Sequence, residues 1–446
     1  MFSKFALTSK HKMILGWVLV ITMLGWGVFR MSRRLSDEPY IDFKAFYLAA
    51  EAARLGNNPY RAGDEVYVYP PMLAALMSPL SMLNMTQAAW VWFGMTVVAT
   101  GGALWLVWST LKNRLNWKTE PGDFILALGV TMLIWQTQCR WQFEQGQTDW
   151  LTLCALSISF AVLDRYPAIV GMALGFAINV KYMPLMVVAY LAFRRRWSTV
   201  IWSMVGVVVW AMLPALVYGW SNNLLFLGQG LAGLGKLFGV VIPEQAYYIF
   251  PLTYDRSITF TSAWARIAES QGLGNVFIAG MTALTALTVL AIGCIIYRTH
   301  QVRLWNGRGG ALEAQPVNRG TVAMEFWLSI VLMLTFSLQA QMRHFYLLLP
   351  LVLLTSGLLV CGSTTRIRSL ALTGLLIGVV GSIGADIFSL FGARESWKFI
   401  SGAAVSTVIL GFLTLIAGIQ EVQYHQATAT DSTTDNAQDG ATLLAA

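Results

Sequence analysis

Asp42 is the residue of this chain whose type and position best suit it to take a proton from a substrate. It begins the run Asp42-Phe43-Lys44-Ala45-Phe46-Tyr47, after which apolar residues continue at helical spacing as far as Gly56. This pattern predicts an amphipathic helix that lies on the outer membrane face. The carboxylate has two roles open to it, because Asp is among the best N-cap residues and is also a general base. Glu38 is the second candidate for the base.

Several cations could hold a phosphate group. Lys181 lies between two apolar runs, where an ammonium is costly unless it pairs or reaches the interface, so it is either a snorkelling lysine or a phosphate clamp. Arg343 and His344 stand together at the end of a predicted span, where an interfacial histidine is the alternative to a site residue. Arg256 and Arg266 are weaker candidates, since loop arginines are usually solvated.

Polar and aromatic side chains near these candidates could line a substrate site. The same residues would also be explained without any site. The polar ones could belong to the end of a transmembrane helix, and the aromatic ones to chain turns at the membrane interface. They are Glu38, Tyr47, Tyr60, Tyr69, Gln145, Gln147 and Asp149. No DxD-type pair occurs in the first loop and the four cysteines have no CxxC spacing, so we predict neither a metal nor a bound cofactor.

The composition indicates what kind of molecule positions these residues. Of 446 residues, 56% are hydrophobic and 12% are charged, and the mean hydropathy is +0.59. These values exclude a soluble enzyme. The net charge of +8 comes from residues between apolar runs. This is the orientation signal of a membrane protein and does not indicate nucleic-acid binding.

The hydropathy predicts about twelve transmembrane helices, with both termini on the cytoplasmic side by the positive-inside rule. The spans are placed at 13–29, 88–110, 122–138, 149–163, 167–180, 182–193, 199–218, 276–297, 323–340, 344–361, 369–391 and 399–419. Residues 30–87 and 219–275 are then long outer loops, the second with a re-entrant or interfacial segment at 224–242. We expect one domain over residues 1–419 and a disordered cytoplasmic tail over 420–446.

The order of several short motifs resembles glycosyltransferase family 87, the polyprenol-phosphate-sugar-dependent membrane enzymes. The motifs span roughly residues 40 to 360. They are Asp42-Phe-x-x-Phe-Tyr-x-Ala-Ala50, Gly56-x-x-Pro59-Tyr60, Tyr69-Pro70-Pro71, Gln145-Gly146-Gln147-x-x-Trp150-Leu151, Gly171-x-x-Leu174-Gly175, Lys181-x-x-Pro184, Arg194-Arg195-Arg196-Trp197 and Arg343-His344-Phe345-Tyr346. Asp255-Arg256-Ser257 departs from the Asn-Gln-Ser that the family often shows at that place.

The resemblance implies an all-α GT-C type fold with its active site at the outer face of a bacterial-type cytoplasmic membrane. It implies that Asp42 is the catalytic base, and that a sugar passes from a polyprenyl-phosphate donor to a lipid or glycan acceptor with inversion. Lys181, Arg343, His344, Arg256 and Arg266 would bind the donor phosphate. Mannose is the expected donor sugar, and arabinofuranose is the alternative. The oligomeric state stays open.

Two other classes of protein fit parts of the sequence. A transporter or flippase of lipid-linked sugars would also have many spans and intramembrane cations, but we find no internal repeat of the kind many such proteins carry. A noncatalytic scaffold in cell-envelope assembly would make Asp42 dispensable. Neither explains the order of the first-loop motifs.

Overall fold

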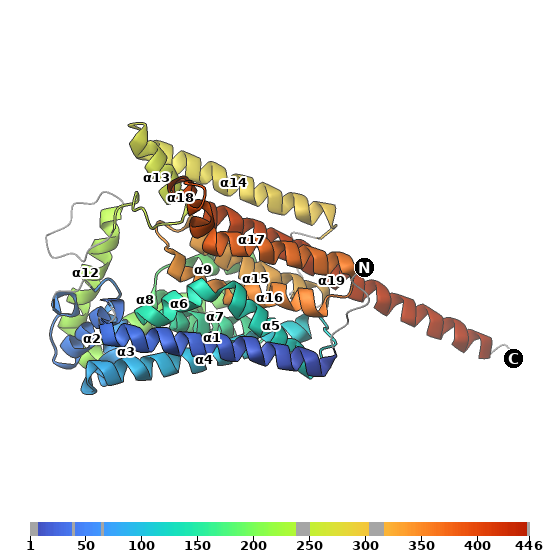
Figure 1. Cartoon of the computed structure of the whole chain (residues 1–446), viewed down its shortest axis with the longest axis horizontal. Coiled ribbons are helices and arrows are strands. Elements are labelled where there is room, and N and C mark those ends of the chain that lie inside the picture. The colour runs from blue at the N-terminus through green and yellow to red at the C-terminus, as the bar shows by residue number, and fades with distance from the viewer. Residues whose placement is uncertain (1–7, 38–40, 64–66, 238–249, 303–315, 444–446) are drawn as a thin grey trace.

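The chain is an all-α integral membrane protein. The computed structural model describes residues 8–37, 41–63, 67–237, 250–302 and 316–443. Within these ranges the regular structure is helical, and the single β-type contact is an isolated bridge between Ser257 and Gln341. Most of the long helices run in a similar direction along the molecule (Figure 1).

The helices follow one another along the chain with short connections. The first part contains α1 (Ser9–Asp37), α2 (Ile41–Arg54), η2 (Pro59–Arg61), α3 (Pro71–Met77), η3 (Ser78–Met82), α4 (Met85–Arg114), α5 (Pro121–Ile134), α6 (Gln136–Gln145), α7 (Asp149–Val162), α8 (Pro167–Val180) and α9 (Leu185–Phe193). The second contains α10 (Trp197–Met212), α11 (Ala215–Tyr218), α12 (Trp220–Leu237), α13 (Phe260–Ser270), α14 (Asn275–Thr299), α15 (Pro316–Phe336), η4 (Met342–Leu348), α16 (Leu349–Cys361), α17 (Thr365–Ser389), α18 (Arg394–Phe399) and α19 (Gly402–Leu443).

Eight helices of the described chain are long and apolar enough to cross a membrane, so the predicted number of twelve is not confirmed. They cover Ser9–Arg34, Met85–Arg114, Trp197–Tyr218, Asn275–Thr299, Arg319–Phe336, Met342–Cys361, Thr365–Ser389 and Gly402–Thr428. The other four predicted spans correspond to α5, α7, α8 and α9, which have at most 14 residues. A helix of that length covers about 21 Å, less than the roughly 30 Å of a hydrocarbon core.

The helix predicted after Asp42 is present as α2, but its aromatic stripe does not dock on the membrane surface as expected. Phe43 and Phe46 are 1% and 2% exposed, and Ala49 and Ala50 are fully buried. This face packs against α3, η3 and η2. The spacing of these residues therefore predicted the buried face of the helix correctly. This face is buried against other helices and not against the membrane. Figure 1 shows α2 and α3 at the end of the bundle where α12 also lies.

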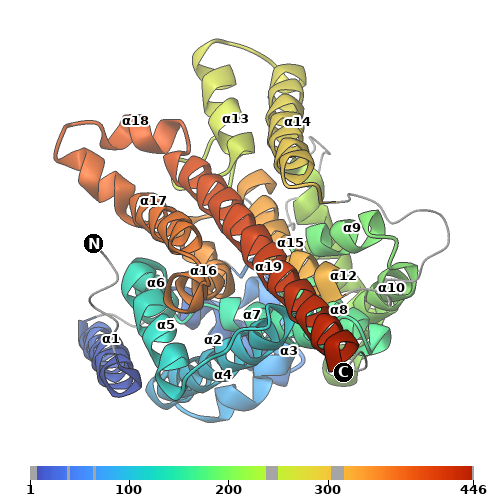
Figure 2. The same ribbon diagram turned by 90° about the vertical axis from the view of Figure 1, so that its right-hand side faces the viewer.

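Close packing of glycines joins α8 to α10. A Cβ on Gly175 would lie 2.3 Å from the Gly206 carbonyl carbon, and one on Gly171 would lie 2.4 Å from Trp202. Small residues four apart let two helices in a membrane approach closely. In contrast, α13 and α14 form a hairpin at one edge of the bundle (Figure 2).

The last helix continues beyond residue 420, where we predicted a disordered tail. Glu421 is fully buried and accepts hydrogen bonds from the backbone N–H and hydroxyl of Ser363, and Val422 is also buried. These contacts hold the helix against the start of α17 past the predicted boundary. The helix then runs on to Leu443 and projects beyond the body of the molecule (Figure 1).

Candidate active site

Asp42 lies in the first turn of α2 and forms an ion pair with Arg343 of η4. The Arg343 guanidinium is 2.5 Å from Asp42 Oδ2 and also donates to Gln145 Oε1 at 3.0 Å. The two charged side chains are 25% and 19% exposed, so substrate can reach them. The hydrogen bonds to the carboxylate come from side chains, and its place at a helix N-terminus favours negative charge. The geometry therefore supports a site role for Asp42 over that of an N-cap.

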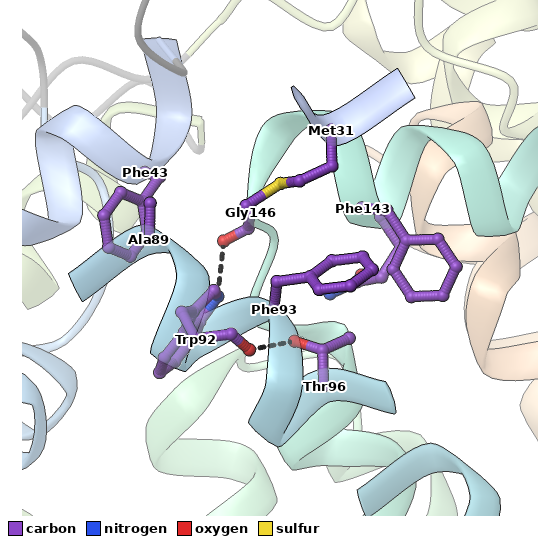
Figure 3. A pocket seen from close by; sticks show the side chains of 9 residues that line it. Met31, Phe43, Ala89, Trp92, Phe93, Thr96, Phe143 and Gly146 are labelled. Carbon is purple, nitrogen blue, oxygen red and sulfur yellow. Dashed lines mark hydrogen bonds between the residues drawn. The ribbon is translucent and has the colours of Figure 1, made fainter. Parts of the chain in front are cut away.

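The loop behind Asp42 is held in one conformation by Gly146. This residue has φ +60°, and a Cβ on it would lie 2.8 Å from Phe43 Cβ. The Trp92 indole donates to the Gly146 carbonyl at 2.8 Å, as Figure 3 shows. The apolar pocket around these side chains holds only about 10 Å³, too little for a substrate. It is packing that fixes α2 against the loop.

Gln147 follows in this loop and is fully buried behind the carboxylate. Its amide N–H donates to Asp42 Oδ2, and its Oε1 accepts from the Tyr69 hydroxyl at 3.2 Å. Tyr60 in turn donates to the Tyr69 carbonyl at 3.0 Å. We predicted Gln147 and Tyr60 to line the substrate; in the structure Gln147 contacts both Asp42 and Tyr69, and Tyr60 contacts the Tyr69 backbone.

A second ionic group lies deeper, between α7, α8 and η4. Lys181 Nζ lies 2.5 Å from Asp149 Oδ1 and 2.9 Å from His344 Nδ1. Asp149 is fully buried and Lys181 is 7% exposed. The same ring nitrogen of His344 lies 3.2 Å from Asp149 Oδ2, so Nδ1 contacts both members of the buried pair. Lys181 is thus neither a snorkelling lysine nor a free clamp, because Asp149 compensates its charge.

A cavity of about 550 Å³ begins at Arg343 and Gln145. It lies between α6, the loop before α13, and α17 to α19. Five of its lining residues are cationic, Arg140, Arg256, Arg343, Arg394 and Lys398, and two are anionic, Asp255 and Asp386. This volume falls within the range that suits a sugar-sized ligand, and the excess of cations suits a phosphate group. Asp42 reaches this cavity through its partner Arg343.

Two of the predicted site residues, Arg266 and Tyr47, lie elsewhere. Arg266 donates to the carbonyls of Tyr254, Ser257, Lys398 and Phe399 and to the Ser401 hydroxyl. Burial lowers its pKa, and Asp255 opposes this shift. It joins the loop before α13 to α18 and does not serve a phosphate. The Tyr47 hydroxyl donates to the Leu83 carbonyl, which ties α2 to the start of α4. Glu38 lies outside the described residues.

The sequence did not single out three cations that line the cavity, and it did not predict the partner of Asp149. Asp149 was noted only as a lining residue, and its partnership with Lys181 spans 32 positions. Arg140, Arg394 and Lys398 line the cavity but belong to short loops and helix ends, where basic residues usually report only membrane orientation. Within the described ranges, no group of three or more His, Cys, Asp and Glu side chains is arranged to hold a metal ion.

Comparison with known proteins agrees with these motifs. The sequence profile of glycosyltransferase family 87 matches residues 67–265. The predicted resemblance to family 87 is confirmed. A curated relative from Mycobacterium tuberculosis, a polyprenol-phosphate-mannose-dependent alpha-(1-2)-phosphatidylinositol pentamannoside mannosyltransferase, is 27% identical over 237 residues, which cover 50% of this chain and 48% of the relative.

A second curated relative comes from Mycolicibacterium smegmatis. It is a polyprenol-phosphate-mannose-dependent alpha-(1-2)-phosphatidylinositol mannoside mannosyltransferase, 27% identical over 225 residues, which cover 46% of this chain and 48% of the relative. The chain therefore spans about half the length of the curated relatives that it matches. No solved structure matches it. The GT-C type fold stays a prediction.

Proposed function

We propose that the protein is a membrane glycosyltransferase. It transfers a sugar from a polyprenyl-phosphate donor to a hydroxyl of a lipid or glycan acceptor at the outer membrane face. Mannose is the sugar that we expect. The observation that carries the proposal is the Asp42–Arg343 ion pair beside a cation-lined cavity. The names of the two relatives support the donor, because both are polyprenol-phosphate-mannose-dependent.

The paired charges suit the two halves of the reaction. Arg343 turns from Asp42 to the phosphate of the donor, a contact that guanidinium groups make in a bidentate way. Asp42 then accepts the proton of the acceptor hydroxyl. The acceptor oxygen bonds to the anomeric carbon as the bond from that carbon to the phosphate oxygen breaks, and polyprenyl phosphate leaves. Direct displacement converts a β-linked donor into an α-linked product.

The buried residues position these groups. Gln147 donates a hydrogen bond to the Asp42 carboxylate. The buried Asp149–Lys181 pair contacts His344, which directly follows Arg343 in the sequence. Interactions that are set before the substrate arrives cost no reorganisation during the reaction.

Asp42→Asn is the variant that tests the proposal. Purified protein in detergent would be given radiolabelled polyprenyl-phosphate-mannose and lipids from the native membrane. We expect the wild type to transfer label and the variant to be slower by about 10²- to 10⁴-fold, the range of a lost general base. Glu51→Gln is the matched control, because Glu51 lies on the same helix and pairs with Arg54 on the exposed side. Equal turnover in Asp42→Asn would exclude Asp42 as the base, and no transfer by the wild type would contradict the assigned donor.

A further inference from the structure

Two arginines that line the cavity each have a buried N–H group without an acceptor. These are the Nε–H groups of Arg140 and Arg343, and neither has a hydrogen-bond partner in the described part of the chain. Buried donors are nearly always paired in folded proteins, and leaving one unpaired on a cationic group is especially costly. Both donors would be satisfied by a ligand with several acceptor oxygens and a negative charge, such as a phosphate group.

Arg343 contacts the site residues through only one of its three nitrogens. Its Nη1 donates to Asp42 Oδ2 at 2.5 Å and to Gln145 Oε1 at 3.0 Å. A guanidinium group has five N–H donors, so this arginine keeps donors for a ligand even while it is paired with Asp42. The unpaired Nε–H is one of them.

The carboxylate closest to Arg140 is bonded to another arginine. Glu144 Oε1 lies 3.8 Å from Arg140 Nε, too far for a hydrogen bond, but 2.5 Å from Arg30 Nε. One carboxylate is therefore shared by two arginines, and it is closer to Arg30. The two carboxylates that line the cavity, Asp255 and Asp386, form no ion pair with Arg140 in the described structure. Arg140 thus has both a positive charge and a donor to offer to a ligand.

The helix that carries Arg140 is fixed against the one that carries Arg343, because α6 packs directly on η4. Just before α6, the Trp135 indole donates to the Phe345 carbonyl of η4 at 2.7 Å. At the other end of α6, Gln145 accepts its hydrogen bond from Arg343. The two elements are therefore preorganised relative to each other, as a site for one small group requires.

We propose that Arg140 is a second residue that binds the donor phosphate, together with Arg343. The inference rests on the proposed function and adds a residue that lies outside the motifs of the sequence. When the bond to the anomeric carbon breaks, its electron pair stays on the phosphate oxygen, and the phosphate charge rises from one to about two. A second cation at the phosphate stabilises this developing charge, so Arg140 should affect kcat as well as binding.

A binding experiment tests the contact without turnover. A short-chain polyprenyl phosphate and the matching neutral polyprenol would be titrated into the full chain in detergent by calorimetry. We expect the wild type to bind the phosphate at least about tenfold more tightly than the alcohol, and Arg140→Gln to lose about tenfold in phosphate affinity at an unchanged melting temperature. Arg366→Gln removes the same charge from an exposed position outside the cavity and should bind like the wild type. Equal phosphate affinity in Arg140→Gln and the wild type, or no preference in the wild type, overturns the proposal.

Steady-state kinetics distinguish phosphate binding from a purely structural role of Arg140. With polyprenyl-phosphate-mannose as donor, we expect Arg140→Gln to raise the donor KM and to lower kcat, each about tenfold, with an unchanged KM for the acceptor. Arg140→Lys keeps the charge and should recover part of both losses. A lower kcat with an unchanged donor KM would mean that Arg140 acts only through the packing of α6, which overturns the proposal. Phosphate binding that depends on Arg140, without transfer by the wild type, would refute the proposed function and leave the phosphate contact standing.

Discussion

At the scale of single residues, two ion pairs organise the site. Asp42 is paired with Arg343, and Asp149 with Lys181. The outer pair is partly exposed and can exchange its partners for substrate, whereas the inner pair is buried and cannot. We therefore assign reaction steps to the outer pair and positioning to the inner one.

Gln147→Met tests the positioning of Asp42. The change keeps the side-chain length but removes both the donor to Asp42 and the acceptor for Tyr69. We expect kcat to fall about 10- to 100-fold, because small displacements of a catalytic group cost rates of this order. KM for the donor should change little, since Arg343 is untouched. Gln271→Met, at an exposed position, is the control. An unchanged kcat would show that Asp42 does not need this contact.

Asp149→Asn tests the buried pair. The substitution leaves the Lys181 ammonium in the protein interior with no carboxylate, which costs about 3–5 kcal/mol. We expect a lower melting temperature in detergent and a smaller yield of folded protein. The double variant Asp149→Asn/Lys181→Met removes the charge and should recover most of the stability. Equal melting temperatures for the single variant and the wild type would contradict the pairing.

At the scale of helices, the sequence predicted which segments would be helical but not how they would meet. The spacing of Phe43, Phe46 and Ala50 located the buried face of α2, and the turn at Gly56 located its end. The partner of that face could not be predicted, because an apolar stripe suits lipid and protein equally well. The short helices α5, α7, α8 and α9 were predicted as spans for the same reason: hydropathy does not distinguish burial in protein from burial in lipid.

The candidate site was predictable only in part. Asp42, Arg343, His344 and Lys181 were identified from their types and places in motifs. The pairing of Lys181 with Asp149 was not, since it depends on α7 and α8 lying side by side. The cavity cations Arg394 and Lys398 were hidden because a basic residue between spans looks the same whether it marks orientation or faces a ligand.

Gly175→Leu tests the contact between α8 and α10. The backbones approach so closely that the Cβ of any other residue would lie 2.3 Å from a Gly206 backbone atom. We expect the helices to separate, and the melting temperature to fall by an amount equivalent to about 1–3 kcal/mol or more. Gly280→Leu on α14 is the control, because nothing lies within 4 Å of its position. Equal losses in both variants would show that the contact contributes nothing specific.

At the scale of the whole molecule, the site draws on segments from both ends of the sequence. Its charged residues come from α2, α7, the α8–α9 connection and η4. The start of α1 and the end of α19 lie toward the opposite end of the bundle (Figure 1). The C-terminal part of α19 is therefore expected to affect stability through its packing and not the site, whereas the start of the same helix lines the cavity at Gly402 and Ala403.

Two truncations separate these parts of α19. A chain that ends at Thr428 keeps Glu421 and its hydrogen bonds to Ser363, and should match the full chain in melting temperature. A chain that ends at Ile419 loses Glu421 and Val422 and leaves Ser363 without these contacts. We expect that chain to melt at a lower temperature, by an amount equivalent to about 1–3 kcal/mol. Equal melting temperatures for the two would place the end of the packed helix before residue 420.

In the proposed reaction, the pairing of Arg343 with Asp42 also predicts how the spent lipid carrier is released after transfer. The departing polyprenyl phosphate is a monoester with up to about two negative charges, whereas the donor has one. It should compete more strongly than the donor for Arg343 and keep the guanidinium away from Asp42. We therefore expect added polyprenyl phosphate to inhibit competitively against the donor, with the inhibition lost in Arg343→Gln. The rate in the membrane would then depend on how fast the carrier is removed.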